Sequence, residues 1–204
     1  EAAPLRRERV RALLGPCGVS CKVVDVSEPG ALAAFAGADG VNCPDVVLHL
    51  AAQAGVRRSM DAPMDFVQDN LLGFAQVLEY ARHACVPRLL YASSSSVYGD
   101  RSEGAFAEDD RTDRPRSFYA ATKMANELMA RAYAQQYGLR SLGLRFFTVY
   151  GPWGRPDMAV LGFAKRLLDG EPLPVFGGGE LQRDFTYVDD TVAALQALVE
   201  HDHP

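Results

Sequence analysis

Two observations on the sequence predict an α/β protein built on a doubly wound parallel sheet. Short apolar runs typical of buried strands alternate with longer stretches in which apolar residues recur at helical period. Parallel strands need a crossover connection of a dozen or more residues, and the helical stretches supply it. We therefore expect helices on the faces of the sheet and a ligand site beyond the carboxyl ends of its strands.

Each expected element has its own local signal. Apolar runs predict the strands, and helical spacing, as for Phe66, Phe74 and Val77, predicts the helices. Gly138 is expected to end the helix that begins near Ser117. The expected strands are 20–26, 45–52, 88–94 and 141–147, and the expected helices are 31–37, 63–84, 117–137, 158–170 and 188–200.

The composition is that of a globular protein with one sizeable core. The chain has 204 residues, 48% of them hydrophobic, and a net charge of −5. This charge gives no reason to expect a nucleic-acid partner. No apolar run approaches the roughly 20 residues of a membrane span, and no signal peptide opens the sequence, so we expect no membrane partner.

The cysteines and histidines do not predict a metal site. None of the cysteines forms a C-x-x-C pair, so we expect a reduced, cytoplasmic protein. The spacing of Cys17 and Cys21 is interpreted as incidental. His201 and His203 belong to a C-terminus that we expect to fray.

Tyr119 and Lys123 are the first candidates for chemistry. They lie four residues apart in SFYAATKMANEL (117–128), and so on one face of the predicted helix. An ammonium beside a phenol favours the phenolate; lowering the pKa of a tyrosine from about 10 to about 7 takes roughly 4 kcal/mol. Tyr119 would then be a catalytic base. The alternative is an amphipathic surface helix with a half-exposed tyrosine and a solvated lysine.

Chemically rich segments follow three of the predicted strands. AAQAGVR (51–57), SSSSVYG (93–99) and TVYGPWGRPDMA (148–159) all lie where strands end. Loops that follow buried strands are where rigid scaffolds place function. The serines come directly after a strand and end in a turn, which favours a hydroxyl site over a flexible linker.

These segments together resemble one protein family. HLAAQAGVR, YASSSSVYG, SFYAATKMANEL, LRFFTVYGPWGRPDMA and RDFTYVDD run from His49 to Asp190 and are similar to blocks of the extended short-chain dehydrogenase/reductase family. Within it they look like the UDP-glucuronate 4-epimerases. The resemblance implies a Rossmann-like NAD-binding domain over residues 1–147. It also implies part of a small substrate-binding lobe over 148–204, interleaved with a late Rossmann strand and helix.

The resemblance also implies roles for individual residues. The implied catalytic residues are Ser94, Tyr119 and Lys123. The implied NAD contacts are Asp25, Val26, Ala51, Ala52, Gln53, Tyr119, Lys123 and Phe146. The implied UDP-sugar contacts are Ser95, Ser96, Thr148, Arg155, Val175, Phe176 and Arg183.

Several of these residues have a plainer interpretation. Phe146 and Phe176 could be core residues, and Arg183 could form a surface ion pair with Asp184. His49 is expected to be a core histidine. Asn70 could equally brace backbone or touch a ligand.

The implied reaction is oxidation of the sugar at C4, rotation of the 4-keto sugar, and reduction on its other face. With a uronic acid, the 4-ketone is β to the C6 carboxylate and carbon dioxide can leave, so we expect Arg155 to hold that carboxylate bidentately. UDP-glucuronate decarboxylase and UDP-hexose 4-epimerase are alternatives. Dehydratases carry Asp-Glu after the catalytic residue, where this chain has Ser95 and Ser96.

The sequence departs from the family at both ends. It contains no G-x-x-G-x-x-G, the loop that cradles the pyrophosphate. Strands one and two of the family fold are therefore expected to be absent, as is the end of the substrate lobe. Segment 20–26 would lack its neighbour, and 45–52 would expose an apolar edge. We expect a piece of a longer gene product.

A second class of function stays open. Without the glycine loop, the chain could be a catalytically inactive remnant that no longer binds NAD well. In both cases the resemblance implies a homodimer through helices 63–84 and 117–137.

Overall fold

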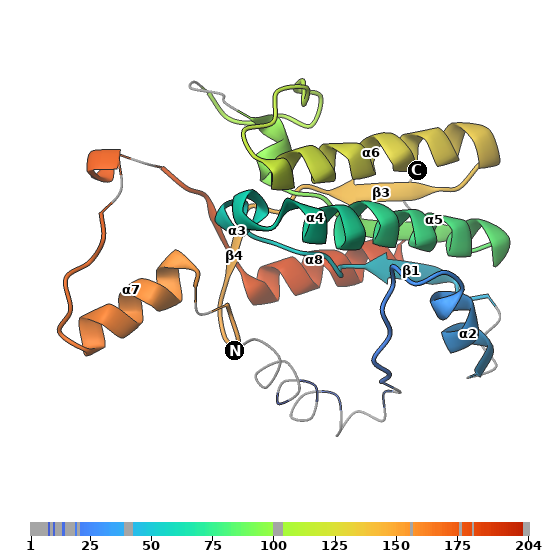
Figure 1. Cartoon of the computed structure of the whole chain (residues 1–204), viewed down its shortest axis with the longest axis horizontal. Coiled ribbons are helices and arrows are strands. Elements are labelled where there is room, and N and C mark those ends of the chain that lie inside the picture. Colours follow the sequence, from blue (N-terminus) through green and yellow to red (C-terminus); the bar gives the residue numbers. More distant parts are fainter. Residues whose placement is uncertain are drawn as a thin grey trace. The chain divides into compact units, whose positions relative to one another are not determined.

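The structure, a computed structural model, divides into two compact units (Figure 1). One unit is Lys22–Phe146; the other is Glu1–Cys21 with Phe147–Pro204. The predicted domain boundary between residues 147 and 148 remains a prediction. The residues that the structure describes are 8, 10, 14, 19, 21–38, 43–99, 104–155, 157–175, 177–180 and 182–201.

The described part of the unit Lys22–Phe146 contains a three-stranded parallel sheet. Its strands, in the order β1-β2-β3, are β1 (Val46–His49), β2 (Arg88–Ala92) and β3 (Ser141–Leu144). Val46 pairs with Arg88, and Leu89 pairs with Ser141. This sheet confirms the predicted parallel α/β fold. Each strand is shorter than the apolar run that predicted it.

Helices connect these strands where helical period predicted them. The predicted helix 63–84 is a continuous run of α4, a π-helical segment and α5, and α3 before it was not predicted. Ser117 caps α6, because its Oγ accepts a hydrogen bond from the Ala120 N–H at 3.0 Å, and Gly138 ends it with a φ of 69°. The helices are α2 (Ala31–Ala38), α3 (Val56–Asp61), α4 (Pro63–Phe66), the π-helical segment (Val67–Leu72), α5 (Gly73–His83) and α6 (Phe118–Tyr137), with a 3₁₀ turn at Ser95–Tyr98.

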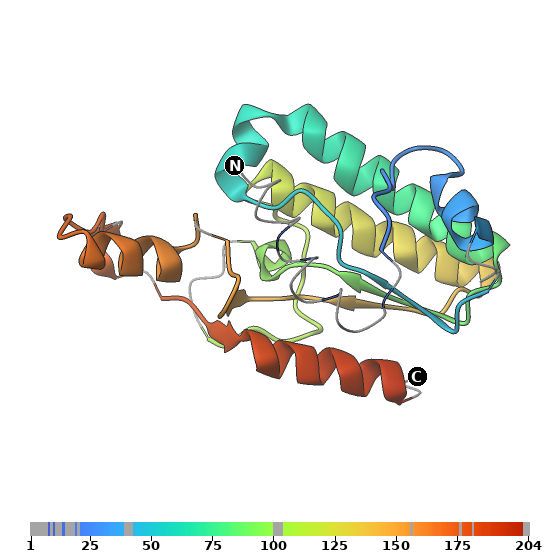
Figure 2. The same cartoon turned by 90° about the horizontal axis from the view of Figure 1, so that it is seen from below.

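The core of this unit lies between the sheet and the helices α5 and α6, which cover one face of it (Figure 2). Tyr91 crosses β3 at Gly143, where a Cβ would lie 2.5 Å from the Tyr91 hydroxyl oxygen. A larger residue at this position of β3 would therefore displace the Tyr91 ring. The buried core residues are Phe74, Val77, Leu78, Ala81, Val86, Leu89, Tyr91, Ala130 and Leu139.

The predicted strand at 20–26 is wrong. Ser20 lies outside the described residues, Cys21–Asp25 form no strand, and Val23 is fully exposed. A strand is held by hydrogen bonds to a neighbour, and none of the described strands pairs with this segment. Instead, the Asp25 carboxylate accepts hydrogen bonds from the Ser27 N–H at 2.9 Å and the Ser27 hydroxyl at 2.7 Å, which turns the chain toward α2.

The other face of the sheet is partly exposed. Leu48 and Leu142 flank Leu90 on this face, and they are 40% and 37% exposed. Parallel sheets are normally covered on both faces. Among the described strands β1 is the terminal strand of this sheet, in agreement with the exposed edge expected for segment 45–52.

The second unit has a smaller parallel pair of strands. In β4 (Thr148–Tyr150) and β5 (Phe185–Tyr187), Thr148 pairs with Phe185. Neither strand was predicted as a separate element. The helices α7 (Ala159–Leu168) and α8 (Val188–Glu200) agree with the predicted ones, and a 3₁₀ turn lies at Gly177–Gly179.

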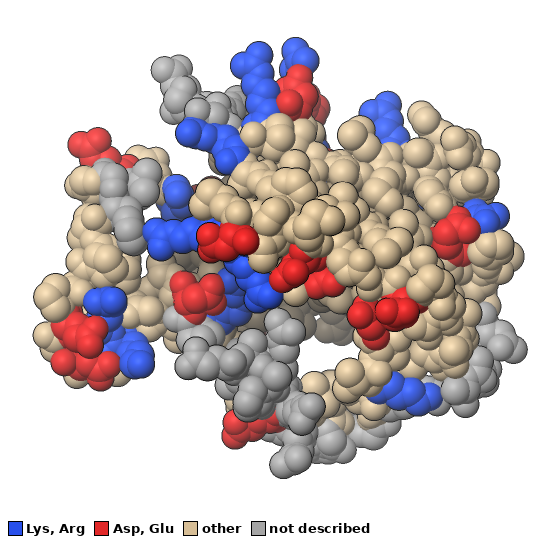
Figure 3. Space-filling view, viewed as in Figure 1, with Lys and Arg blue, Asp and Glu red and all other residues tan. Residues whose placement is uncertain are grey.

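The face of the molecule seen in Figure 3 is mixed in charge. Lys and Arg side chains lie among Asp and Glu side chains on the face seen in Figure 3. None of the helices in the described residues is both long and apolar enough to cross a membrane.

Candidate active site

Several predicted site residues of the unit Lys22–Phe146 follow the carboxyl ends of its parallel strands: Ala51–Gln53 after β1, Ser94–Ser96 after β2 and Phe146 after β3. Pairing between β2 and β3 continues beyond both strands, because the Ser93 N–H donates to the Leu144 carbonyl and the Ser95 N–H to the Phe146 carbonyl, both at 2.8 Å. These bonds bring the serine-rich turn beside Phe146. Figure 1 shows the start of α6 lying next to this turn.

Ser94 is held as the cap of the 3₁₀ turn Ser95–Tyr98. Its hydroxyl oxygen accepts hydrogen bonds from the Ser96 N–H at 3.2 Å and from the Ser96 hydroxyl at 2.7 Å. A serine hydroxyl can accept two hydrogen bonds and donate one. Ser94 can therefore still donate its own proton to a ligand.

Lys123 is the most deeply buried charged residue of the candidate site. It is 3% exposed, and its Nζ donates a hydrogen bond to the Ala92 carbonyl at the end of β2, at 2.8 Å. Burial lowers the pKa of Lys123 to about 8. Burial and then the charge of Lys123 lower the pKa of His49 to about 4, so His49 is neutral at pH 7. The His49 ring packs 5.6 Å from that of Phe74, in agreement with a core histidine.

Tyr119 lies in the first turn of α6, one helical turn before Lys123 and on the same face. The tyrosine is half-buried, and its ring packs edge-on against Phe66 with centroids 6.2 Å apart. Tyr119 thus has neither the full burial of a core residue nor the exposure of a surface one.

Asn70, in the π-helical segment, clamps the backbone of Gln53. Its Oδ1 accepts from the Gln53 N–H at 2.8 Å, and its Nδ2 donates to the Gln53 carbonyl at 3.1 Å. The same Nδ2 donates to Thr122 Oγ1 at 3.1 Å, and that hydroxyl donates to the Tyr119 carbonyl at 2.8 Å. Asn126 donates to the Asn70 carbonyl at 2.7 Å.

The clamp joins the Ala51–Gln53 segment to the turn of α6 that carries Tyr119. Asn70, Thr122 and Asn126 are each 2% exposed, so their hydrogen bonds are shielded from water. π-Helical turns are frequent at functional sites. Of the two roles considered for Asn70, the structure supports the backbone brace.

A second polar network, which the sequence did not reveal, holds α6 to the end of β3. Arg145 Nε and Nη2 donate to the two carboxylate oxygens of Glu127 at 3.0 and 2.9 Å. Ser93 donates to the same carboxylate at 2.5 Å. The Arg145 guanidinium also lies 4.8 Å from the centre of the Tyr98 ring. The sequence signal that could have indicated this network is the position of Glu127, which follows Lys123 by one helical turn and so lies on the same face of α6.

Asp25 and Val26 lie in the turn before α2. The Gln68 amide donates to the Ser27 hydroxyl at 2.9 Å, which docks this turn on the π-helical segment. Hydrogen bonds from Ser27 lower the pKa of Asp25. Asp25 lines a hollow of 660 Å³ together with Lys22 and Phe35. The predicted contact with an adenine remains a prediction.

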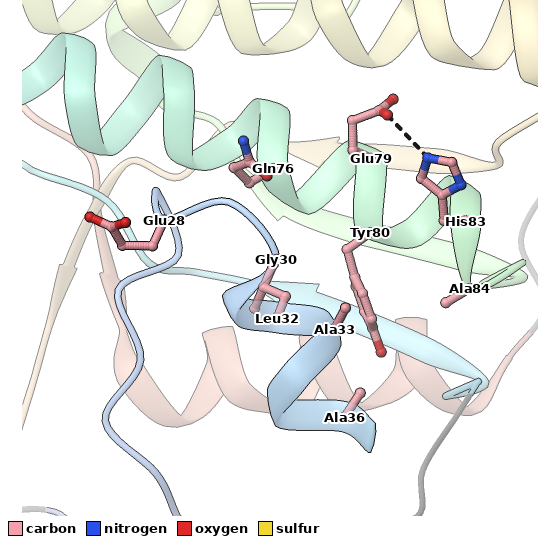
Figure 4. Close-up of a pocket in the computed structure, with 10 residues that line it drawn as sticks. All are labelled: Glu28, Gly30, Leu32, Ala33, Ala36, Gln76, Glu79, Tyr80, His83 and Ala84. Atoms are coloured by element: carbon pink, nitrogen blue, oxygen red, sulfur yellow. Dashed lines mark ion pairs between the residues drawn. The ribbon is translucent and has the colours of Figure 1, made fainter. Parts of the chain in front are cut away.

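A second cavity lies between α2 and α5 and contains none of the predicted site residues. Its volume is 620 Å³, and Glu28, Leu32, Tyr80 and His83 are among the residues that line it (Figure 4). Figure 4 also shows the ion pair of His83 and Glu79, 3.4 Å apart. Glu79 already accepts hydrogen bonds from Arg82 and Tyr133, so its carboxylate braces the helices.

The remaining predicted residues belong to the other unit. Thr148 lies in β4, and its N–H donates to the Asp184 carbonyl at 3.3 Å. Arg155 holds Asp157 with two hydrogen bonds. Arg183 is exposed, and its side chain donates a hydrogen bond to the Gln182 carbonyl at 2.6 Å. An ion pair of Arg183 with Asp184 is not among the contacts of the described residues. Val175 is exposed, and Phe176 lies outside the described residues.

Among the described residues, no cluster of three His, Cys, Asp or Glu side chains could hold a metal ion. Cys17 and His203, which were considered at the sequence level, lie outside those residues.

Comparison with known proteins shows the family. The chain belongs to the NAD dependent epimerase/dehydratase family, whose profile matches residues 7–204. It is 48% identical over 155 residues to a probable UDP-glucuronate 4-epimerase of Rhizobium meliloti, covering 76% of this chain and 46% of that protein. It is 53% identical over 150 residues to UDP-glucuronate 4-epimerase 3 of Arabidopsis thaliana, covering 72% of this chain and 35% of that protein.

A solved structure supports the same relationship. The UDP-glucuronic acid 4-epimerase of Bacillus cereus, in complex with UDP-glucuronic acid and NAD, matches with a TM-score of 0.83 and 33% identity. The match covers 98% of this chain and 62% of that one. The chain thus spans slightly less than half the length of the bacterial relatives that it matches.

The Asn70 clamp makes a prediction about stability. Asn70→Ala removes the side-chain amide, and with it the acceptor of the Gln53 N–H and both donated hydrogen bonds. We expect a loss of about 2–4 kcal/mol in the free energy of unfolding, and faster hydrogen exchange at the Gln53 amide. Denaturant titration and hydrogen exchange measure the two effects.

Asp69→Asn is the matched control. In the described contacts, Asp69 accepts a hydrogen bond from the Gln53 side chain, at 2.7 Å, and not from its backbone, so this neighbouring change should leave the Gln53 amide protected. Equal effects of the two substitutions would contradict the clamp.

The buried ammonium makes a prediction about pH. The pKa of Lys123 is about 8 in the folded chain and about 10.4 in an unfolded one. Between these values the unfolded chain binds more protons, so this lysine makes stability rise with pH across the window. We expect the stability of wild type relative to Lys123→Met to rise by about 3 kcal/mol from pH 8 to 10.5. A difference that stays constant across this window would contradict the burial of a charged amine.

Proposed function

We propose that this chain carries the active site of a UDP-glucuronate 4-epimerase. The observation that carries the proposal is the buried Lys123 ammonium, which lies one turn after Tyr119 and is held at the strand end that leads into Ser94. The similarity to proteins named UDP-glucuronate 4-epimerase supports the choice of substrate.

In the proposed mechanism, Tyr119 moves the proton of the sugar's 4-hydroxyl group. The Lys123 ammonium stabilises the phenolate form of Tyr119, and Ser94 donates a hydrogen bond to the same sugar oxygen. When bound, NAD would supply the acceptor of the C4 hydride and the donor that returns it. Tyr119 then gives the proton back to the 4-keto oxygen, so no net proton is consumed.

Part of an NAD site fits the residues that are present. A lysine ammonium has three N–H donors, and the bond to Ala92 uses one, so Lys123 can donate the others to ribose hydroxyls. The clamped Ala51–Gln53 segment offers backbone at the adjacent strand end. The sequence has no G-x-x-G-x-x-G for the pyrophosphate. The residues therefore fit the nicotinamide ribose end of the cofactor.

Arg155 is the proposed contact of the uronate carboxylate. Its guanidinium binds the Asp157 carboxylate through two nitrogens, in the geometry that a substrate carboxylate would take. Arg155 is 42% exposed, and an exposed ion pair contributes only about 0–1 kcal/mol. A substrate carboxylate could therefore replace Asp157. We assign Ser95, Ser96, Thr148, Val175, Phe176 and Arg183 to the rest of the UDP-sugar site.

Two alternatives use the same catalytic residues. A UDP-glucuronate decarboxylase would let the 4-keto acid lose carbon dioxide, and a UDP-hexose 4-epimerase would not need Arg155. The third alternative is an inactive chain that no longer binds NAD well.

We also propose a homodimer through α4–α5 and α6, where Met64 and Leu128 are strongly exposed. A cytoplasmic location accords with the exposed, unbonded cysteines of the described residues.

Incubation of the purified chain with UDP-glucuronate and NAD⁺ tests the proposal. The expected product is UDP-galacturonate, identified by chromatography and NMR. Tyr119→Phe should lower kcat at least about 100-fold, because it removes the group that moves the proton. Tyr133→Phe, a change elsewhere on α6, is the control and should keep the activity. Wild-type chain that binds NAD⁺ but forms no epimer would contradict the proposal, and chain that does not bind NAD⁺ would support the inactive alternative.

The role proposed for Arg155 gives a separate prediction. Arg155→Ala should raise KM for UDP-glucuronate roughly tenfold or more, because two charge-assisted hydrogen bonds are lost. It should also divert substrate to the UDP-pentose, measured as released carbon dioxide. Arg166→Ala, on α7, is the control. Clean epimerisation by Arg155→Ala, with no added carbon dioxide, would exclude the clamp.

A further inference from the structure

Cys43 and Cys85 lie opposite each other at the amino ends of β1 and β2. The pairing of Val46 with Arg88 continues through His49 and Tyr91 with a constant offset of 42 residues. The same offset, followed three residues back from the first pair, matches Cys43 with Cys85. Neither cysteine is itself a strand residue, so the offset places the two at corresponding positions ahead of the paired strands and fixes no distance between them.

A direct contact supports this pairing. The Cys43 thiol donates to the Cys85 carbonyl oxygen, with 3.5 Å between sulfur and oxygen. The Cys43 sulfur therefore reaches the backbone of the residue with which it would bond. Both cysteines are exposed, so a small molecule can reach either thiol.

The backbone of Cys85 is unusual for a residue with a side chain. Its φ is 52°, in the left-handed region, at the position after α5 where helices commonly end on glycine. Its N–H donates to the Arg82 carbonyl at 3.3 Å, and the Val86 N–H donates to the Ala81 carbonyl at 2.9 Å, which fixes this turn. Backbone strain of this kind is a reason to look for a role of the side chain.

We propose that Cys43 and Cys85 are a thiol pair that closes reversibly into an intramolecular disulfide on reaction with a small-molecule disulfide such as oxidised glutathione. One cysteine thiolate attacks the glutathione disulfide, forms a mixed disulfide and releases one glutathione. The other thiolate attacks the protein sulfur of that mixed disulfide and releases the second glutathione. The two thiol protons pass to the departing glutathione thiolates, so the protein is oxidised and one glutathione disulfide is reduced.

The thiol pair Cys43 and Cys85 lies away from the candidate catalytic residues. Cys43 and Cys85 precede β1 and β2, whereas Gln53 and Ser94 follow the same strands, at the opposite edge of the sheet. Exposed and strained disulfides are the labile ones. The bond would close the loop of β1, α3, α4, the π-helical segment and α5, and so stabilise this part of the unit.

The experiment uses the whole 204-residue chain, fully reduced and then incubated with oxidised glutathione. Tryptic digestion without reductant should give peptide 23–57 joined to peptide 83–88, with the loss of two hydrogens. Dithiothreitol should separate the two peptides. The oxidised chain should melt roughly 5–10 °C above the reduced chain, because the bond closes a loop of intermediate length.

Substitutions decide whether Cys43 and Cys85 account for the linked peptide and the higher melting temperature. Cys43→Ser and Cys85→Ser should each abolish the linked peptide and the rise in melting temperature. Cys21→Ser, which changes another exposed cysteine, should keep both. Glutathione adducts on Cys43 and Cys85 without the linked peptide would overturn the proposal, and so would disulfides mainly to Cys17 or Cys21.

Discussion

The hydrogen bond from Lys123 to the Ala92 carbonyl is the contact on which the candidate active site depends. It holds a buried ammonium at the end of β2, directly before the serine-rich turn. Burying a charge is costly unless it is paired or hydrogen-bonded, and here burial lowers the pKa of Lys123 to about 8. Such a cost is common at functional sites. The ammonium is thus kept where it can act on Tyr119, one helical turn earlier.

Three polar contacts fasten one helix to the ends of three strands. Thr122 reaches the segment after β1 through Asn70, Lys123 reaches the end of β2, and Glu127 reaches Arg145 after β3. These contacts follow one another along a single stretch of α6. Because each strand end is tied to the same helix, residues from distant parts of the sequence share one rigid frame. Such preorganisation is what the proposed proton transfer from a sugar hydroxyl requires.

Much of the fold could be predicted from local signals, and the errors have a common physical origin. Ser117 and Gly138 mark the ends of α6 because caps act within a few residues. Segment 20–26 has the composition of a strand but no described strand beside it, and pairing is not a local property. Likewise, the spacing of Tyr119 and Lys123 indicated chemistry, whereas the clamp by Asn70 depends on contacts across 52 residues of sequence.

Titration of the Tyr119 phenol tests the central claim most directly. Phenolate absorbance is followed against pH in wild type, Tyr119→Phe and Lys123→Met, each with NAD⁺. If the buried ammonium acidifies the phenol, wild type has one tyrosine that ionises well below the ordinary value of about 10. That ionisation should vanish in Tyr119→Phe and return to the ordinary range in Lys123→Met. An unchanged titration curve in all three proteins would contradict the account.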